Sequence, residues 1–226
     1  MGTDSEHGKI ITQAAREVLA PMGLFRKGQS RIWIDDNDWF LTVVEFQPSA
    51  WEKGSFLNIG TNFLWRRQDY FSFDYYSGIN NRVESFAEFS GDSDDFRSGM
   101  MSYAKNAASY IEEYRRLNDV QYAKEAILQF KPALKSGHRM YHNMMICGLA
   151  RDNRAVEFYK ELLDEVKTSE YDYIRAYSDE LSNDISGIIQ DTDRFHDYVV
   201  SKVLAQRAFW RAKSSMKKLK EAISLD

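Results

Sequence analysis

The fold is decided by one stretch of sequence, FLNIGTNFLW at residues 56–65. Its alternate positions carry mostly apolar side chains: Leu57, Ile59, Thr61, Phe63 and Trp65. The positions between them carry small or polar residues: Asn58, Gly60 and Asn62. Successive side chains of a strand point to opposite faces. The stretch therefore predicts a strand with one face in the core and one polar, water-facing wall that is shallow at Gly60.

The segments around this strand predict the rest of a sheet. Runs of aliphatic and aromatic residues bounded by turn formers predict four further strands, at residues 31–34, 39–46, 71–76 and 82–89. Residues 35–38, Asp-Asp-Asn-Asp, predict the turn between the first two. Apolar residues from Ile11 to Met22 recur at helical spacing. We therefore expect an α+β fold in which an N-terminal helix packs on an antiparallel sheet of about five strands.

After Gly91 the apolar pattern takes the period of a helix and keeps it. We expect helices at residues 93–117, 119–131, 137–150, 153–167, 172–189 and 192–222, which together form a C-terminal helical bundle. The predicted domains are residues 1–92, the helix and sheet, and residues 93–226, the bundle packed on them. Because no Pro-, Gly- or Ser-rich linker separates the halves, they are expected to pack tightly or to form one integrated domain.

Composition and charge limit the classes of function. The 226-residue chain has a formal net charge of −4, which argues against nucleic acid or an anionic membrane as a partner. No stretch approaches the ~20 apolar residues of a membrane-spanning helix, and the acidic N-terminus lacks a signal-peptide pattern. The single cysteine, Cys147, excludes an intrachain disulfide and is expected to be a buried structural thiol. These features favour a cytoplasmic protein.

Three stretches carry a family resemblance: GLFRKG at residues 23–28, VEFQPSAW at 44–51 and KGSFLNIG at 53–60. Through them the chain resembles an uncharacterised bacterial family, the domain of unknown function numbered 4304, over residues 5–115 or so. The resemblance implies a small α+β domain and a bacterial source. It implies no reaction, because none is established for that family, and so no catalytic residues.

The polar wall of the strand at 56–65 is the best candidate binding surface. Its amides, with side chains of the preceding strand and loop, are suited to fix a partner's backbone or a small polar ligand. The candidate binding residues are Gln47, Ser49, Trp51, Asn58 and Asn62. We therefore expect a non-enzymatic protein- or ligand-binding module that needs no cofactor. An immunity protein, which neutralises a toxin, is one version of this hypothesis.

A metal-dependent phosphodiesterase or nuclease is the alternative hypothesis. Asp36 and Asp38, with Glu45 on the next strand, are carboxylates of the kind that hold Mg²⁺ in such enzymes. Against this interpretation, the usual lysine is missing, and turn chemistry alone explains the two aspartates. The separation of the three carboxylates decides between this hypothesis and the binding module, because groups more than about 8 Å apart cannot share one cation.

Two histidines give a weaker metal hypothesis. His138 and His142 are spaced so that a helix puts both imidazoles on one face. The sequence shows no third ligand, so ordinary structural histidines are the favoured interpretation. It also shows no Gly-rich phosphate loop, no GxSxG elbow and no CxxC pair.

The expected partner is accordingly an unknown protein or a small polar ligand. A second copy of the chain is a further possibility, because the helix at 93–117 carries three tyrosines that offer a large aromatic area: Tyr103, Tyr110 and Tyr114. A homodimer therefore stays open.

Overall fold

The computed structural model describes residues 6–131, 137–221 and 223. An N-terminal helix, an antiparallel sheet and then a series of helices confirm the predicted α+β class. The chain forms two compact units. The first comprises Met1–Leu64, Gln68–Arg115 and Arg207–Asp226, and the second comprises Trp65–Arg67 and Arg116–Gln206.

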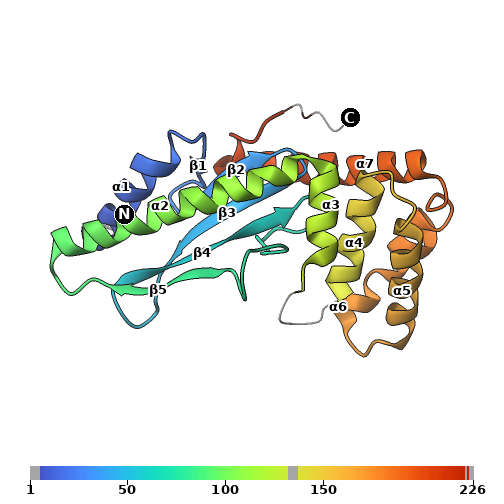
Figure 1. Ribbon diagram of the computed structural model, residues 1–226, viewed down its shortest axis with the longest axis horizontal. Coiled ribbons are helices and arrows are strands. Elements are labelled where there is room, and N and C mark those ends of the chain that lie inside the picture. The colour runs from blue at the N-terminus through green and yellow to red at the C-terminus, as the bar shows by residue number, and fades with distance from the viewer. Residues whose placement is uncertain (1–5, 132–136, 222, 224–226) are drawn as a thin grey trace. The chain divides into compact units, whose positions relative to one another are not determined.

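The first unit is built on a five-stranded antiparallel sheet whose strands lie in sequence order (Figure 1). The strands are β1 (Phe25–Arg26), β2 (Ile32–Asn37), β3 (Phe40–Gln47), β4 (Gly54–Phe63) and β5 (Arg82–Glu88). β3 and β4 pair without interruption from Phe40 opposite Phe63 to Gln47 opposite Phe56. This register puts the even-numbered residues of β4 on the same face as the odd-numbered residues of β3. The alternation in residues 56–65 therefore predicts β4, an interior strand of the sheet, correctly.

The sheet differs from the predicted one in three places. Residues 71–76 form no strand, and within them only Tyr75 pairs, through an isolated bridge to Thr61. The two-residue strand β1 lies at the other edge, and it is too short for periodicity to detect. The predicted turn at 35–38 is wrong in extent, because β2 continues through Asn37 and the hairpin turns at Asp38 and Trp39.

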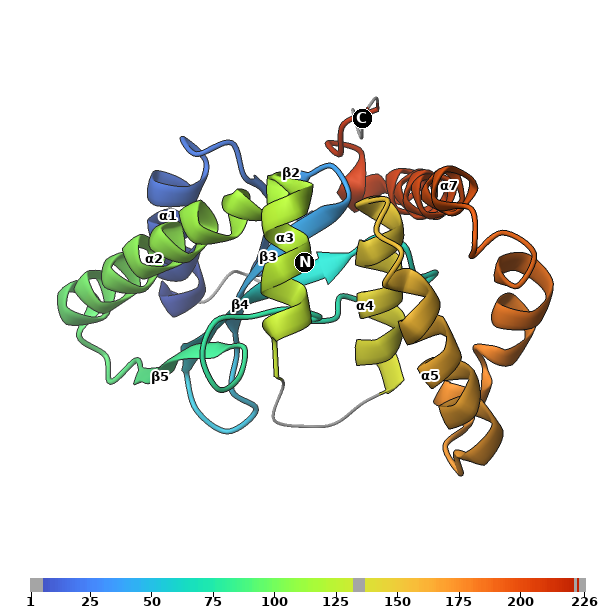
Figure 2. The ribbon, with the colours of Figure 1, turned by 45° about the vertical axis from the view of Figure 1, so that its right-hand side comes forward.

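Two helices of the first unit, α1 (Glu6–Leu19) and α2 (Ser93–Arg115), lie side by side and cover one face of the sheet (Figure 2). Their buried side chains pack against the apolar residues of the strands: Trp33, Val44, Phe46, Leu57 and Ile59. Each fully buried Leu or Ile contributes about 1.5–3 kcal/mol, so the packing on this helix-covered face contributes strongly to the stability of the first unit. At the C-terminal end of α2, the Arg115 guanidinium pairs with the Asp35 carboxylate at 2.8 Å.

The division into units differs from the predicted domains 1–92 and 93–226. Because α2 packs on α1 and the sheet, the first unit extends through Arg115. The chain then returns to the first unit at Arg207, with the last turn of α7 (Thr192–Arg211) and the short helix η3 (Ser214–Met216). Apolar periodicity identifies a helix, but it does not show which neighbouring element packs on the apolar side of that helix.

The second unit is helical. Its elements are η1 (Arg116–Asn118), α3 (Val120–Gln129), α4 (Gly137–Leu149), α5 (Ala155–Thr168), α6 (Asp172–Arg175), the π-helix η2 (Glu180–Ile185) and most of α7. The predicted single helix at 172–189 is thus wrong, and α7 stops at Arg211 instead of continuing toward position 222, which lies outside the described residues. Within the described ranges, no helix has the length and apolar character that crossing a membrane requires.

Candidate functional site

The face of the sheet opposite α1 and α2 carries Asn58, Gly60 and Asn62, but the prediction that they form a water-facing wall is wrong, because all three residues are buried. Strand pairing puts Asn58 opposite Glu45, Gly60 opposite Val43 and Asn62 opposite Leu41, with Gln47 opposite Phe56. We call the surface formed by Glu45, Gln47, Asn58, Gly60 and Asn62 the polar face. Its two ends differ in what covers them.

The Asn62 end of the polar face is closed by the segment that follows β4. Asn62 is 0% exposed, and its Oδ1 accepts hydrogen bonds from Gln68 Nε2 at 2.8 Å and from Ser72 N at 2.9 Å. A Cβ atom on Gly60 would lie 2.8 Å from the Phe73 ring, so the segment rests directly on the glycine. The prediction that Asn62 binds a ligand is therefore wrong.

The other end of the polar face opens into a pocket of about 350 Å³. Its walls are polar apart from one phenyl ring, and it is lined by Glu45, Gln47, Asn58, Phe73, Asn80, Asn81 and Arg82. Two of the five predicted binding residues, Gln47 and Asn58, thus line one pocket. Glu45 of the alternative hypothesis lines the same pocket. We call it the polar pocket.

A hydrogen-bond network fixes the floor of the polar pocket. Asn58 is only 4% exposed, and its Nδ2 donates to Glu45 Oε2 at 3.0 Å and to Gln47 Oε1 at 2.8 Å. Arg82 Nη2 donates to the same Gln47 oxygen at 2.9 Å. Arg82 Nε lies 3.4 Å from Asn58 Oδ1, at the long end of the hydrogen-bond range. Asn58 therefore holds the neighbouring side chains in place, while the polar end groups of Glu45, Gln47 and Arg82 line the pocket.

Arg82 was absent from the predicted site, although it is the cation of the polar pocket. β5 brings it opposite Asn58, and its guanidinium carbon lies 3.9 Å from the centroid of the Phe56 ring. A guanidinium above a ring face is held by a cation–π interaction and keeps its remaining N–H groups for other partners. The register between β4 and β5 shifts between Leu57 and Asn58, so counting along the two strands does not reveal this pairing.

Ser49 and Trp51 lie in the loop between β3 and β4 and do not line the polar pocket. The Ser49 hydroxyl accepts hydrogen bonds from the backbone N–H groups of Trp51 and Glu52, at 3.1 and 3.3 Å, and so shapes the turn. Trp51 is 93% exposed. Ser49 therefore has a local structural role, and Trp51 presents a separate surface.

The three carboxylates of the alternative hypothesis do not form one site. Arg207 Nη1 and Nη2 bind the two oxygens of Asp36 at 2.7 and 2.8 Å, and Lys220 Nζ binds Asp38 at 3.0 Å. Glu45 lies opposite Ile32, four residues along β2 from Asp36, which is about 13 Å of strand. No cluster of three or more metal-binding side chains occurs among the described residues. The geometry therefore contradicts a shared cation site on these residues.

His138 and His142 are both engaged by protein groups of the second unit. Trp65 Nε1 donates to His142 Nδ1 at 3.0 Å, and His138 Nδ1 lies 2.6 Å from the hydroxyl of Tyr177. His142 is buried. Since both rings bind protein groups through a nitrogen, the structural interpretation of the two histidines is the one that the geometry favours.

Cys147 is buried, as predicted. Burial raises the pKa of its thiol to about 12, which keeps the thiolate from forming near neutral pH. The residue therefore acts as a small apolar core side chain.

The tyrosines of α2 serve the first unit itself. Tyr114 is buried in its core, and the Tyr103 hydroxyl donates to the Ser85 carbonyl at 2.9 Å. The homodimer stays a prediction, now without that aromatic area as its support.

No protein-family model matches the chain, and comparison with curated proteins and with solved structures gives no significant match either. The resemblance to the family numbered 4304 thus remains a prediction from the three quoted stretches. The function has to be argued from the chemistry of the polar pocket.

Proposed function

We propose that the protein is a non-enzymatic binding module whose polar pocket takes a small zwitterionic ligand, one that carries a negative and a positive group. The observation that carries this proposal is the placement of one cation, Arg82, and one carboxylate, Glu45, around a floor of amides. Arg82 would receive the negative group of the ligand and Glu45 the positive group. Charge-assisted hydrogen bonds of this kind are about twice as strong as neutral ones.

Preorganisation supports binding at this site. Asn58 holds Glu45 and Gln47 at the same time, and Phe56 supports the guanidinium of Arg82. A ligand therefore meets side chains that are already ordered, which lowers the entropic cost of binding. The lining side chains are amides, one carboxylate, one guanidinium and one phenyl ring, a set suited to recognition more than to nucleophilic attack.

We further propose a cytoplasmic location. The single cysteine is buried as a thiol within the second unit, which is compatible with a reducing compartment.

Isothermal titration calorimetry with simple probes tests the proposed function. Glycine and a glycyl dipeptide carry both charges, whereas acetate and methylammonium carry one each. We expect the two zwitterions to bind more tightly than either single ion. Arg82→Ala should weaken binding of the zwitterions by about tenfold or more, because a charge-assisted contact is lost. Arg82→Lys, which keeps the charge but loses the planar fork, should give an intermediate loss.

Arg97→Ala is the matched control, because Arg97 is an exposed arginine of α2 whose guanidinium contacts Gln13. It should bind the zwitterions like the original protein. Glu45→Gln should reduce the preference for glycine over acetate, since only the positive group of glycine uses the carboxylate. Equal affinity of all four probes, or unchanged binding in Arg82→Ala, would contradict the proposed function.

A further inference from the structure

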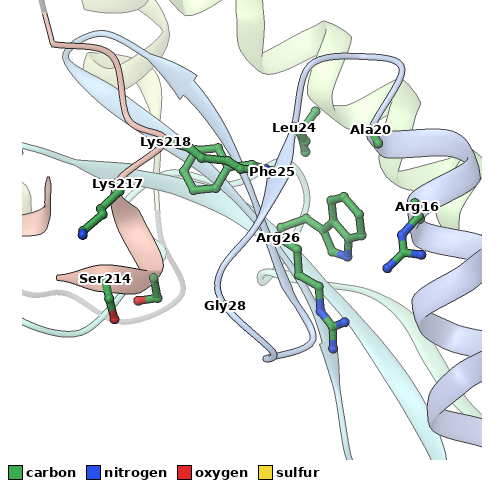
Figure 3. Close-up of a pocket in the computed structure, with 11 residues that line it drawn as sticks. Arg16, Ala20, Leu24, Phe25, Arg26, Gly28, Ser214, Lys217 and Lys218 are labelled. Carbon is green, nitrogen blue, oxygen red and sulfur yellow. The ribbon is translucent and has the colours of Figure 1, made fainter.

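A second cavity in the first unit is larger than the polar pocket and shares no residue with it. Its volume is about 600 Å³, within the range of about 300–1,000 Å³ that small-molecule sites occupy. Residues of α1, of the β1–β2 hairpin and of the segment at η3 line it. In Figure 3 the guanidinium groups of Arg16 and Arg26 lie on one side of the view, and Lys217 and Ser214 lie on the other.

The lining of this cavity is strongly basic. It includes four cationic side chains and no carboxylate: Arg16, Arg26, Lys217 and Lys218. The chain as a whole carries a net charge of −4, so the local excess of positive charge runs against the composition. Within the part of the chain that the structure describes, Arg16, Lys217 and Lys218 form no ion pair with an acidic side chain. Such a cluster lowers its own repulsion by binding an anion.

Arg26 is positioned in advance by its own turn. Its Nε donates to the Ser30 carbonyl at 2.5 Å, and its Nη2 donates to the Gln29 carbonyl at 2.6 Å. The Nη1 group is left for another acceptor, because an arginine has five N–H donors. The opposite wall comes close at Gly28, where an added Cβ would lie 3.3 Å from the Cβ of Ser215.

The cavity also has an apolar part. Leu24, Phe25 and Trp33 line it, and all three side chains are largely buried, so only their edges reach the cavity. The serine hydroxyls of Ser214 and Ser215 add further hydrogen-bond donors. The site therefore combines several cations and hydroxyl donors with an apolar surface.

We propose that this cavity binds a phosphorylated small molecule with an aromatic part. Phosphate groups suit it better than a single carboxylate, because each presents several oxygens and up to two negative charges to the arginine forks and the lysines. The ring would lie against the apolar edge formed by Leu24, Phe25 and Trp33. The inference is independent of the proposed function of the polar pocket.

Calorimetric titration of the full chain with ADP, adenosine and pyrophosphate tests this second site. We expect ADP, which has both parts, to bind more tightly than adenosine or pyrophosphate. Its affinity should fall as salt is added, since exposed charges are screened. The double variant Arg16→Ala/Lys218→Ala should weaken ADP binding by about tenfold or more, through the loss of two charged contacts.

Three comparisons separate a built site from non-specific electrostatic attraction. The double variant Arg97→Ala/Lys105→Ala also removes two positive charges, but from α2 and away from the cavity. It should leave ADP binding nearly unchanged. Ser214→Trp keeps all four cations but fills the cavity, and it should abolish binding. Arg82→Ala, in the polar pocket, should bind ADP normally. No binding of ADP, an equal loss in the α2 control, or normal binding in Ser214→Trp would overturn the assignment.

Discussion

The side-chain amide of Asn58 donates a hydrogen bond of 2.8 Å to the Oε1 of Gln47, on the neighbouring strand. The same amide binds the Glu45 carboxylate at 3.0 Å. One buried donor group thus satisfies two acceptors that face the polar pocket. It determines where both of those side chains lie.

Asn58→Asp should therefore destabilise the first unit. The substitution keeps the shape but replaces the donor with a carboxylate beside Glu45, and we expect a cost of about 1–3 kcal/mol in the free energy of unfolding. Urea denaturation near neutral pH measures it. Asn153→Asp, at an exposed amide in a turn, should change the stability by less than about 0.5 kcal/mol. Similar values for the two variants would mean that the Asn58 network contributes little.

Gly60→Ala tests the closed end of the polar face. The new methyl group would lie 2.8 Å from the Phe73 ring and 3.0 Å from the Tyr75 carbonyl oxygen, so the covering segment must shift. Overpacking of this kind costs about 1–3 kcal/mol. Gly99→Ala is the control, because nothing lies within 4 Å of its added Cβ inside α2. There alanine should stabilise by up to about 1 kcal/mol. Thermal or urea unfolding of both variants should therefore give changes of opposite sign.

Removing one partner of the buried ion pair between Arg207 and Asp36 should destabilise the first unit strongly. Arg207→Ala would leave the Asp36 carboxylate without its main cation, and we expect a loss of about 3–5 kcal/mol. Arg211→Ala, which breaks a pair with the exposed Glu221, should cost about 0–1 kcal/mol. Urea denaturation curves of the two variants compare them directly. A loss below about 1 kcal/mol for Arg207→Ala would show that the C-terminal segment is not anchored at Asp36.

Tyr114 predicts a loss of stability at alkaline pH. Burial raises its pKa to about 12, whereas an unfolded tyrosine titrates near pH 10. The folded state therefore holds the proton longer, and the stabilisation present below about pH 10 is lost as the pH rises toward about 12. We expect this single group to account for a loss of about 3 kcal/mol over that window. Urea denaturation at a series of pH values measures it.

Tyr114→Phe should lower the stability near neutral pH, because it removes the Tyr114 hydroxyl, which accepts a hydrogen bond from the Ser77 N–H. It should also make the alkaline decline shallower. Tyr171→Phe, at an exposed tyrosine, should leave the decline as it is in the original chain. An equally steep decline in Tyr114→Phe would assign the alkaline loss to other groups.

The sequence predicts the core of the first unit well and its covering segments poorly. Alternation in residues 56–65 identifies β4 because both faces of an interior strand constrain side-chain type. Residues 71–76 show a similar aromatic pattern, but only Tyr75 pairs with the sheet, through one bridge to Thr61, while Ser72 and Phe73 lie against Asn62 and Gly60. A half-buried extended segment has the same pattern whether it pairs at an edge or covers a face, so local sequence does not separate the two cases.

For a related reason, only part of the candidate site could be predicted from the sequence. Gln47 and Asn58 follow from strand alternation alone. Arg82 depends on an irregular register, and the partner of Asp36 is Arg207, which lies 171 positions further along the chain. The short spacing of Asp36 and Asp38 suggests a metal site, but their ion pairs with distant residues give them a structural role. Such long-range pairing is not encoded in a local motif.

The most direct test of the divided polar face is a nuclear magnetic resonance titration with glycine, which follows the side-chain signals of Asn58, Asn62, Gln47 and Arg82. The side chains of the polar pocket should shift as glycine is added: Gln47, Asn58 and the Arg82 Nε–H. The Asn62 amide, closed off by Gln68 and Ser72, should not move. Shifts at Asn62 as large as those at Asn58, or no shift at Arg82, would contradict the claim that one end of this sheet face is closed and the other binds.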